Sequence, residues 1–390
     1  MNISSELLKT WLSIRYNPTE TTFYGKPKAN LPRRLTIAEF KQPKLTEPFR
    51  SLANRLTYVV DKIILRYAKE DKIGILGGGG IDSTVILASL LCFEAEPTLI
   101  TLGFGEPEDE IESAALTAEY FDVPHKWKIS TNCLKNTAQA NKCLDEPTRH
   151  ACENYEIVKF AKECGCQIVF DGLGIDELFG GYYWRYENTQ RLGGDIQAYL
   201  TGANQYDYLP SDHRFWGEEL KAVTVDWPRM FPDFNADLPL FSKVSLTDYN
   251  AKCRMNFMPV SRIGSDLGVK IIQPWLTDEF IDFALQVPDE YKYWRGMTKL
   301  LFKEAFKDLV PIHSLLKKKQ GFGAAPASNT VMRQLRQHSD KILDGWLVDN
   351  GYVNDVYYEE ALRCNKPTPT QTNKLWDAYT FEVWLRERGG

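Results

Sequence analysis

Short apolar runs alternate with amphipathic stretches between residues 49 and 182. A short continuous apolar run bounded by Gly or Pro is typical of a buried strand, whereas apolar residues spaced three and four apart are typical of a helix. Strands and helices that alternate along the chain predict an α/β fold with a doubly wound parallel sheet. The expected strands are residues 72–76, 97–103, 125–129 and 167–170, and the expected helices start at Phe49, Asp82, Pro107 and Tyr155.

The pattern changes on either side of this region. Residues 1–45 are rich in Pro, Lys and Arg, so we expect an extended arm there. Residues 46–185 hold the predicted sheet. In residues 186–390 strands become scarce and helical spacing dominates, as in 277–288 and 297–309, which predicts a mainly helical C-terminal half.

Composition and charge exclude several classes of protein. The chain of 390 residues is 43% hydrophobic and 25% charged, which is a globular composition and excludes a disordered or collagen-like chain. The net charge of −5 does not favour a nucleic-acid-binding surface. No apolar run approaches the ~20 residues of a membrane span, the N-terminus has no secretory pattern, and eight cysteines in such a chain fit a reducing compartment. We therefore expect a cytoplasmic protein with no membrane partner.

The most informative segment is a run of glycines between a predicted strand and a predicted helix, IGILGGGGIDST over residues 73–84. Glycine lets the backbone turn sharply and bring its N–H groups close to an anion, and the N-terminus of the following helix adds a positive dipole end. The aspartate after the glycines is placed to hold Mg²⁺ against phosphates, and the next serine to donate a hydrogen bond. A glycine-rich turn without a ligand is the structural alternative. The residues assigned to this phosphate site are Gly78, Gly79, Gly80, Asp82 and Ser83.

The loop differs from two common phosphate motifs, because it has neither Gly-Lys-Ser/Thr nor G-x-G-x-x-G with a following acidic ribose ligand. It resembles the S-G-G-x-D-S pyrophosphate loop of the ATP-pyrophosphatase, or PP-loop, enzymes, which cleave ATP to AMP and pyrophosphate. The match is close at every position except Gly78, which stands where that family usually has serine. The resemblance implies ATP and Mg²⁺ as cofactors, and a fold like that of the adenine nucleotide alpha hydrolases.

A second segment, QIVFDGLGIDELFGGY over residues 167–182, has an acidic pair after another predicted strand. A carboxylate just past the carboxyl end of a strand lies where a doubly wound sheet binds its ligands. Asp176 is therefore a candidate to share Mg²⁺ with Asp82. Taken alone, Asp176 and Glu177 also fit a helix N-cap followed by a first-turn Glu, which is common in any protein.

This second segment resembles the G-x-G-x-D-E-L-F-G-G-Y signature of asparagine synthetase synthetase domains, and further matches follow in the family's order. LDEP at 144–147 resembles the D-E-P before this strand, KLLFK at 299–303 resembles K-x-x-L-R, KKQGF at 318–322 resembles R-K-x-G-F, and NKLWDAYTFEVWLR at 373–386 resembles the closing tryptophan-rich helix. The resemblance implies one synthetase-like domain over residues 46–390, with the nucleotide-binding sheet in 46–185 and the helical substrate half in 186–390.

The N-terminal arm also resembles part of this family. Residues 11–34 are similar to the linker that ends the family's glutaminase domain, and Asn2 stands where that domain carries its nucleophilic cysteine. We interpret residues 1–45 as a remnant of the linker, and we expect the chain to make no ammonia of its own from glutamine.

The resemblance implies roles for single residues. Lys299 matches the family's catalytic lysine and would stabilise charge at the α-phosphate and during amide formation, although its spacing alone favours a solvated lysine on an amphipathic helix. Lys319 stands in a run of three lysines and is either a phosphate ligand or part of a surface charge run. The implied catalytic residues are Lys299, Asp82 and Asp176, and the implied lining of the adenosine pocket is Leu76, Asp171 and Gly172.

Several positions depart from the family pattern. Gly78 removes a hydroxyl contact to pyrophosphate, and a hydrogen bond of that kind to a charged group contributes about 1.5–3 kcal/mol. Leu173 stands where the family has Glu or Asp, a residue that the asparagine-forming enzymes tie to the second half-reaction, and this argues against aspartate as the acid. Ile272 and Thr277 stand in place of an arginine and an aspartate, which indicates a different acceptor or nucleophile.

The leading hypothesis is an ATP-dependent, adenylate-forming amide ligase, which joins a carboxylate to an amine or ammonia and releases AMP and pyrophosphate. Its partners would be a small-molecule or peptide carboxylate and an amine or ammonia, with a separate glutaminase as one source of ammonia. One alternative is a PP-loop enzyme that modifies a nucleobase or tRNA, which the −5 charge weakens. The other is a catalytically degenerate, nucleotide-binding partner subunit, favoured by Gly78 and Leu173 and opposed by the retained Asp82, Asp176 and Lys299. The oligomeric state is left open, a homo-oligomer included.

Overall fold

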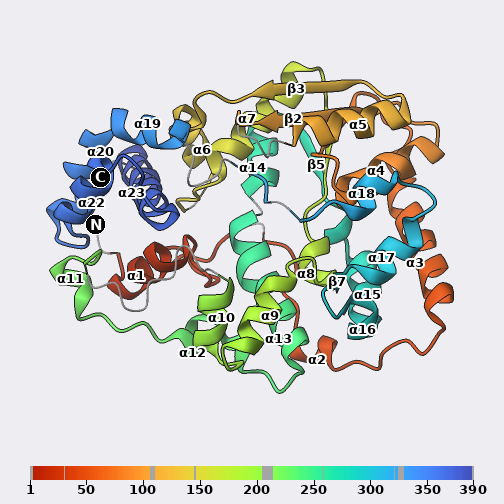
Figure 1. The fold of residues 1–390 in the computed structure, drawn as a ribbon, viewed down its shortest axis with the longest axis horizontal. Coiled ribbons are helices and arrows are strands. Elements are labelled where there is room, and N and C mark those ends of the chain that lie inside the picture. Colours follow the sequence, from red (N-terminus) through yellow and green to blue (C-terminus); the bar gives the residue numbers. More distant parts are fainter. Residues whose placement is uncertain are drawn as a thin grey trace.

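A parallel sheet of five strands forms the centre of the molecule, with the order β3-β2-β1-β4-β5 (Figure 1). The computed structural model describes residues 3–29, 31–105, 110–144, 146–203, 214–257, 259–319, 321–323 and 329–388. The doubly wound α/β fold expected from the sequence is confirmed, and the four predicted strands are all present. The strands are β1 Ile73–Leu76, β2 Thr98–Gly103, β3 His125–Ile129, β4 Ile168–Asp171 and β5 Lys270–Ile272.

The strands are continuous apolar runs because both faces of the sheet are covered. Side chains alternate between the faces of a strand, so successive apolar residues enter two different cores. Ile75, Leu99 and Phe170 pack in one core with helices α3 (Phe49–Ile64) and α4 (Ile81–Cys92). Ile100 and Val169 pack in the other core with α7 (Ala151–Glu163) and α23 (Pro369–Glu387).

The remaining helices surround these layers, and most of them follow strand β4 in sequence. Among the described residues no helix is long and apolar enough to cross a membrane. The other helices of the first half are α2 Ile37–Phe40, α5 Ile111–Phe121, α6 Thr137–Lys142 and α8 Ile175–Phe179. Those of the second half are α9 Tyr183–Arg191, α10 Ile196–Ala203, α11 Glu218–Lys221, α12 Trp227–Met230, α13 Leu240–Thr247, the π-helix η3 Asp248–Phe257, α14 Pro259–Leu267, α15 Asp278–Gln286, α16 Asp289–Lys292, α17 Leu300–Phe306, α18 Ile312–Leu316, α19 Asn329–Gln337, α20 Ser339–Leu343, α21 Trp346–Asp349 and α22 Asp355–Arg363.

Strand β5 is the element of the sheet that the sequence pattern does not reveal. It lies in the mainly helical half and contains three residues, too few for a period to appear. Its register with β4 pairs Phe170 with Ile272, so the edge of the sheet comes from a segment about a hundred residues away from β4. The boundary drawn at residue 185 therefore does not separate the sheet from everything that follows it.

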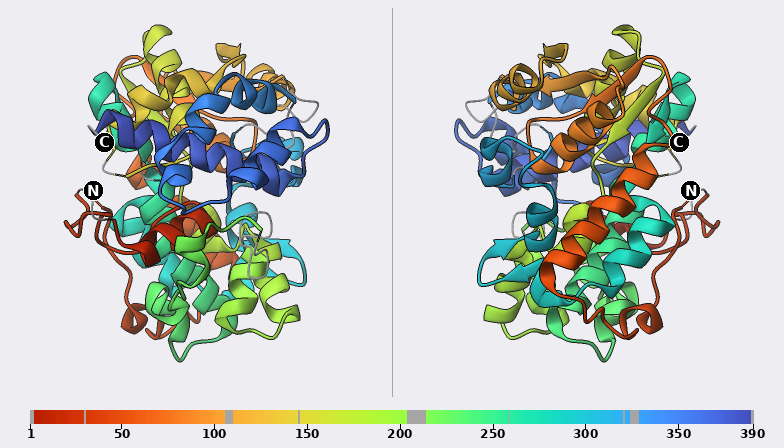
Figure 2. Two further views of the ribbon diagram at one scale, coloured as in Figure 1. Left: turned by 90° about the vertical axis from the view of Figure 1, so that its left-hand side faces the viewer. Right: turned by 90° about the vertical axis from the view of Figure 1, so that its right-hand side faces the viewer.

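The N-terminal arm differs from the extended segment that its composition predicts. Residues Ser5–Ile14 form helix α1, which lies beside α23 (Figures 1 and 2). Trp11 is fully buried, and its Nε1 donates a hydrogen bond to the carbonyl oxygen of Pro147 at 3.0 Å. Lys374 of α23 donates to the carbonyl oxygen of Leu12. The prediction of extended structure is wrong here, because α1 gains its stability from tertiary burial and not from local propensity.

The part of the arm that follows α1 is held by one buried carboxylate. Glu146 accepts hydrogen bonds from Asn17 Nδ2 and from the Phe23 backbone N–H, each at 2.8 Å, and its other oxygen lies 2.8 Å from Lys28 Nζ. This glutamate belongs to the segment compared with D-E-P, whose aspartate, Asp145, lies outside the described residues. The segment therefore fastens the arm to the domain.

Candidate active site

A cavity of about 410 Å³ lies at the carboxyl ends of β1 and β4. The chain leaves β1 toward β2 on one side, whereas β4 is the neighbour on the other side, so the strand order reverses between β1 and β4. In an open α/β sheet such a switch point leaves a crevice in which ligands bind. The loops after both strands line this cavity, and the glycine loop leads directly into the N-terminus of α4.

The structure brings nearly all of the predicted site residues to this cavity. Gly79 is the exception. Its backbone is left-handed, with φ of +75°, and an added Cβ would lie 2.4 Å from the carbonyl oxygen of Ser113 in α5. Gly79 thus serves the turn and the close contact with α5, while its neighbours face the cavity. Their individual roles stay predictions. The predicted residues that line the cavity are Leu76, Gly78, Gly80, Asp82, Ser83, Asp171, Gly172, Asp176, Lys299 and Lys319.

Four charged residues from separate segments form one cluster in the cavity. Lys299 Nζ donates a hydrogen bond to Asp82 Oδ1 at 2.6 Å and makes an ion pair with Asp176 Oδ1 at 2.7 Å. Lys319 Nζ lies 2.8 Å from the other oxygen of Asp176. Lys319 therefore lines the cavity and pairs with Asp176, while its role as a phosphate ligand stays a prediction.

The two carboxylates of this cluster respond differently to burial. Burial raises the pKa of Asp82, and the Lys299 ammonium offsets that effect only in part, so its pKa is above the usual range. Burial also acts to raise the pKa of Asp176, but Lys299 and Lys319 together outweigh it and hold the pKa well below the usual range. Asp176 is therefore ionised at neutral pH, as a cation ligand requires.

Lys299 reaches this position through an unusual backbone conformation. It caps the N-terminus of α17 with φ of +54°, in the left-handed region that residues other than glycine rarely adopt. Its N–H donates to the carbonyl oxygen of Phe179 at 3.1 Å, and its side chain is only 5% exposed. Strain of this kind persists where surrounding structure holds it and is concentrated at functional sites.

Gly181 in the G-G-Y part of the second motif leaves room for the cluster. An added Cβ at Gly181 would lie 1.7 Å from Asp176 Oδ1 and 2.7 Å from Lys299 Cε. Sequence reasoning did not assign a role to this glycine. Its place in the motif could have marked it as important, but the need for glycine there comes from a tertiary contact with Asp176 and Lys299.

The residues present fit a magnesium ion with bound phosphates. Asp82 and Asp176 already converge on a single cation, the Lys299 ammonium. Among the described residues no group of three or more His, Cys, Asp or Glu side chains is arranged to hold a metal. Mg²⁺ is commonly bound by one or two carboxylates, with substrate phosphates and water completing its octahedron. Two converging carboxylates are therefore the donor set expected for a metal that arrives with a nucleotide.

Comparison with known proteins agrees with this geometry. A family model described as asparagine synthase matches residues 61–386. The chain belongs to this family. It is 22% identical to asparagine synthetase (glutamine-hydrolyzing) 1 of Bacillus subtilis, across 98% of this chain and 69% of that protein. It is 28% identical to a putative asparagine synthetase of Methanocaldococcus jannaschii, across 60% of this chain and 36% of that protein. It is 24% identical to asparagine synthetase B of Escherichia coli, across 43% of this chain and 36% of that protein.

Within the asparagine synthase family pattern, Gly78 is explained by a neighbour that sequence reasoning missed. An added Cβ at Gly78 would lie 2.2 Å from the carboxyl group of Glu110, so this carboxylate fills the space of a serine side chain. Lys317 lies 3.8 Å from Glu110 and donates to the carbonyl oxygen of Gly78. Lys317 and Lys319 lie two residues apart in a segment after α18, and both line the cavity.

The other departures from the family pattern fall in different places. Leu173 lines the cavity and gives it an apolar wall. Ile272 and Thr277 are absent from the lining: Ile272 is buried in β5, and Thr277 caps α15. Gln273, next to Ile272, does reach the site, because its Nε2 donates to Asp171 Oδ2 at 3.0 Å. Of the apolar replacements, Leu173 is thus the one in a position to alter what the cavity accepts.

Sequence reasoning also missed a group of charged residues in the cavity wall and directly beside it. Arg185 lies over the ring of Tyr182 at 3.9 Å and pairs with Asp248 at 2.9 Å. Burial, followed by the nearby Asp176 charge, raises the pKa of Glu177 to about 7. Neither carboxylate oxygen of Glu177 has a hydrogen-bond partner among the described residues. Further lining residues without an assigned role are Arg15, His150, Asn154, Trp184, Lys252 and Phe322.

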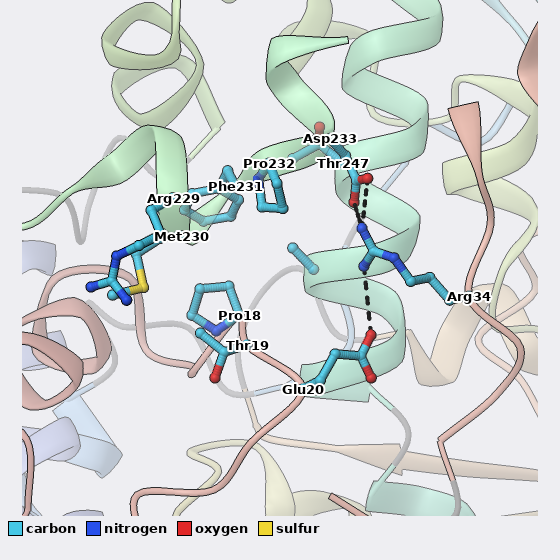
Figure 3. Close-up of a pocket in the computed structure, with 11 residues that line it drawn as sticks. Pro18, Thr19, Glu20, Arg34, Arg229, Met230, Phe231, Pro232, Asp233 and Thr247 are labelled. Atoms are coloured by element: carbon cyan, nitrogen blue, oxygen red, sulfur yellow. Dashed lines mark hydrogen bonds and ion pairs between the residues drawn. The ribbon is translucent and has the colours of Figure 1, made fainter. Parts of the chain in front are cut away.

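A second, smaller pocket of about 210 Å³ shares no lining residue with this cavity (Figure 3). Arg34 lies along one side of it, where it donates to both oxygens of Asp233 at 2.6 and 2.7 Å and lies 3.5 Å from Glu20. No residue predicted for the active site lines this pocket.

Proposed function

We propose that this chain is an ATP-dependent amide ligase that works through an acyl-adenylate. In the first step a carboxylate oxygen of the acid attacks the α-phosphorus of ATP, and pyrophosphate leaves. In the second step an amine nitrogen attacks the acyl carbon, an amide C–N bond forms, and AMP leaves. The observation that carries the proposal is the meeting of Asp82, Asp176, Lys299 and Lys319 in one cavity at the switch point of the sheet.

The arrangement suits the charge that the first step moves. Pyrophosphate leaves with several negative charges, and its stabilisation needs cations and N–H groups fixed in advance. We assign the glycine loop and Ser83 to pyrophosphate, and the two carboxylates to Mg²⁺, which when bound neutralises the phosphates. On nucleotide binding, Lys299 and Lys319 would exchange carboxylate partners for phosphate oxygens. Leu76, Asp171 and Gly172 would hold the adenosine.

The identity of the acid and of the nitrogen donor is a separate part of the proposal. The relatives are named as asparagine synthetases that hydrolyse glutamine, but this chain spans between 36% and 69% of the length of the three compared above. Leu173 places an apolar wall where the family carries a carboxylate, so we propose an acid other than aspartate. The donor is ammonia, an amine, or ammonia from a separate glutaminase.

One observation favours a second candidate, a nucleotide-binding subunit without catalysis. Glu110 brings a carboxylate against Gly78, in the loop assigned to pyrophosphate. A negative charge at that point opposes a polyphosphate unless Glu110 turns away. Retention of the whole charged cluster around Lys299 opposes this second candidate.

The test is pyrophosphate exchange into ATP, with magnesium, across a panel of carboxylic acids. The expected result is exchange that depends on one acid class and is abolished in Asp82→Asn. Asp71→Asn is the matched control, since Asp71 is exposed and does not line the cavity. ATP binding without exchange for any acid would identify the non-catalytic subunit, and AMP release that requires tRNA would identify a tRNA-modifying enzyme.

A further inference from the structure

One face of helix α7 borders the active-site cavity. His150, Asn154 and Ile157 all line it, and their spacing of four and three residues places them on the same side of the helix. Their helix follows the D-E-P segment and precedes β4, so it runs beside the sheet that carries the glycine loops. His150 is the N-cap residue of α7, at the end of the helix nearest to that segment.

His150 is held by a carboxylate that has no exposure to solvent. Its Nδ1 lies 2.6 Å from Glu153 Oε2, and the Glu153 side chain is 0% exposed, whereas the histidine is 24% exposed. A carboxylate acceptor keeps the proton on Nδ1, so that Nε2 carries the lone pair. A histidine that is oriented in this way by a buried carboxylate, and that borders a cavity, has the form of a general base.

The lysine segment connects this pair to the proposed phosphate site in the same cavity. Gly323 has φ of +124°, and a Cβ there would lie 2.8 Å from Glu153 Oε2 and 3.1 Å from His150 Nδ1. Lys319, whose ammonium contacts Asp176, is four residues earlier. The backbone from Lys319 to Gly323 spans at most about 14 Å, so one short stretch of chain contacts both the histidine pair and the charged cluster. Phe322, between them, packs on Phe104 after β2 with ring centroids 6.0 Å apart.

We propose that His150 is the general base of the amide-forming step and that Glu153 positions it. This inference rests on the proposed function. The attacking amine loses one N–H proton as its nitrogen bonds to the acyl carbon and the bond from that carbon to the AMP oxygen breaks. The proton passes to His150 Nε2, the imidazolium is stabilised by Glu153, and water removes the proton after AMP has left. Leu173 has no carboxylate that could accept this proton, so another group that lines the cavity must accept it.

The experiment measures the two half-reactions separately. Pyrophosphate exchange reports the first, and rapid-quench formation of amide and AMP from a preformed acyl-adenylate reports the second. The acid is the one that supports exchange. The amine is chosen from ammonium chloride, L-glutamine and a short peptide with a free amino terminus.

In His150→Gln, exchange is expected to stay within about threefold of the unsubstituted protein. Amide formation is expected to fall by about 100-fold or more, since a general base usually contributes about 100- to 10,000-fold. Imidazole added to His150→Ala is expected to restore part of the second step, an effect that a purely structural role would not produce. Glu153→Gln is expected to slow the second step alone. His338→Gln, outside the cavity lining, is the matched control and leaves both steps unchanged.

The outcomes distinguish a failure of the proposed base from a failure of the proposed ligase. Normal exchange with unchanged amide formation in His150→Gln refutes the base and leaves the ligase intact. Equal loss of both steps, without rescue by imidazole, shows a structural pair and also refutes the base. Absence of acid-dependent exchange, or of any amide product, in the unsubstituted protein refutes the ligase itself, and the base with it.

Discussion

Gly181 provides a sharp test of the charged cluster, because a single methyl group is enough to disturb it. Its φ is not in the left-handed region, so alanine fits the backbone there. The added Cβ would nevertheless lie 1.7 Å from Asp176 Oδ1, whereas ordinary contacts begin at 3.4 Å. Asp176 must therefore shift by well over 1 Å, and its contacts with Lys299 at 2.7 Å and Lys319 at 2.8 Å cannot both survive.

The size of the expected rate loss follows from the hydrogen bond to Asp176 that is lost. A hydrogen bond to a charged group contributes about 1.5–3 kcal/mol, and a loss of that size in the transition state slows a reaction about 10- to 150-fold. We expect Gly181→Ala to lower the rate of acid-dependent pyrophosphate exchange by a factor in this range. Overpacking is expected to lower the free energy of unfolding by about 1–3 kcal/mol.

The assay combines exchange kinetics with urea unfolding in a double-mutant cycle. In an Asp176→Ala background the main collision partner is absent, so the additional methyl of Gly181→Ala is expected to cost much less stability than in the unsubstituted protein. Equal costs in the two backgrounds would refute the reasoning, as would Gly181→Ala with undiminished exchange.

Other predictions concern groups around the site. The pKa of Glu177 is raised to about 7 from a usual 4.5, so the folded state binds more protons than the unfolded state between these pH values. The free energy of unfolding therefore falls as pH rises from 5 to 7. Glu177→Gln is expected to flatten this dependence, measured by urea unfolding across that range. Gly78→Ser is expected to weaken ATP binding by collision with Glu110, and Glu110→Ala in the same chain to restore it, as calorimetry would show; a single Gly78→Ser with unchanged affinity contradicts this. Glu146→Gln leaves the buried ammonium of Lys28 without its charged partner and is expected to lower the free energy of unfolding by about 3 kcal/mol, whereas a midpoint of urea unfolding equal to that of the unsubstituted chain would contradict the anchoring role.

Much of the sheet could be predicted from local sequence. Each of β1, β2 and β4 is an apolar run next to a turn, and burial on both faces makes such runs continuous, so pattern and environment agree. The glycine loop could also be predicted from local sequence, because a strand, a tight turn and a helix N-terminus are all local features. The order of the motifs then predicted which residues share a site, and the structure brings all but Gly79 to the cavity lining.

By itself, the sequence determined the individual strands, turns and helices and the reactive side chains that each of them contains. Tertiary structure decided how those units meet. Helix α1 exists because Trp11 and Leu12 are buried against distant segments, and β5 because β4 offers a free edge. The space at Gly181, the carboxylate beside Gly78 and the pairing of His150 with the loop at Gly323 depend on contacts between residues far apart in the chain. Such contacts leave no periodicity in the sequence, because their free energy comes from burial and charge pairing that arise only after the chain has folded.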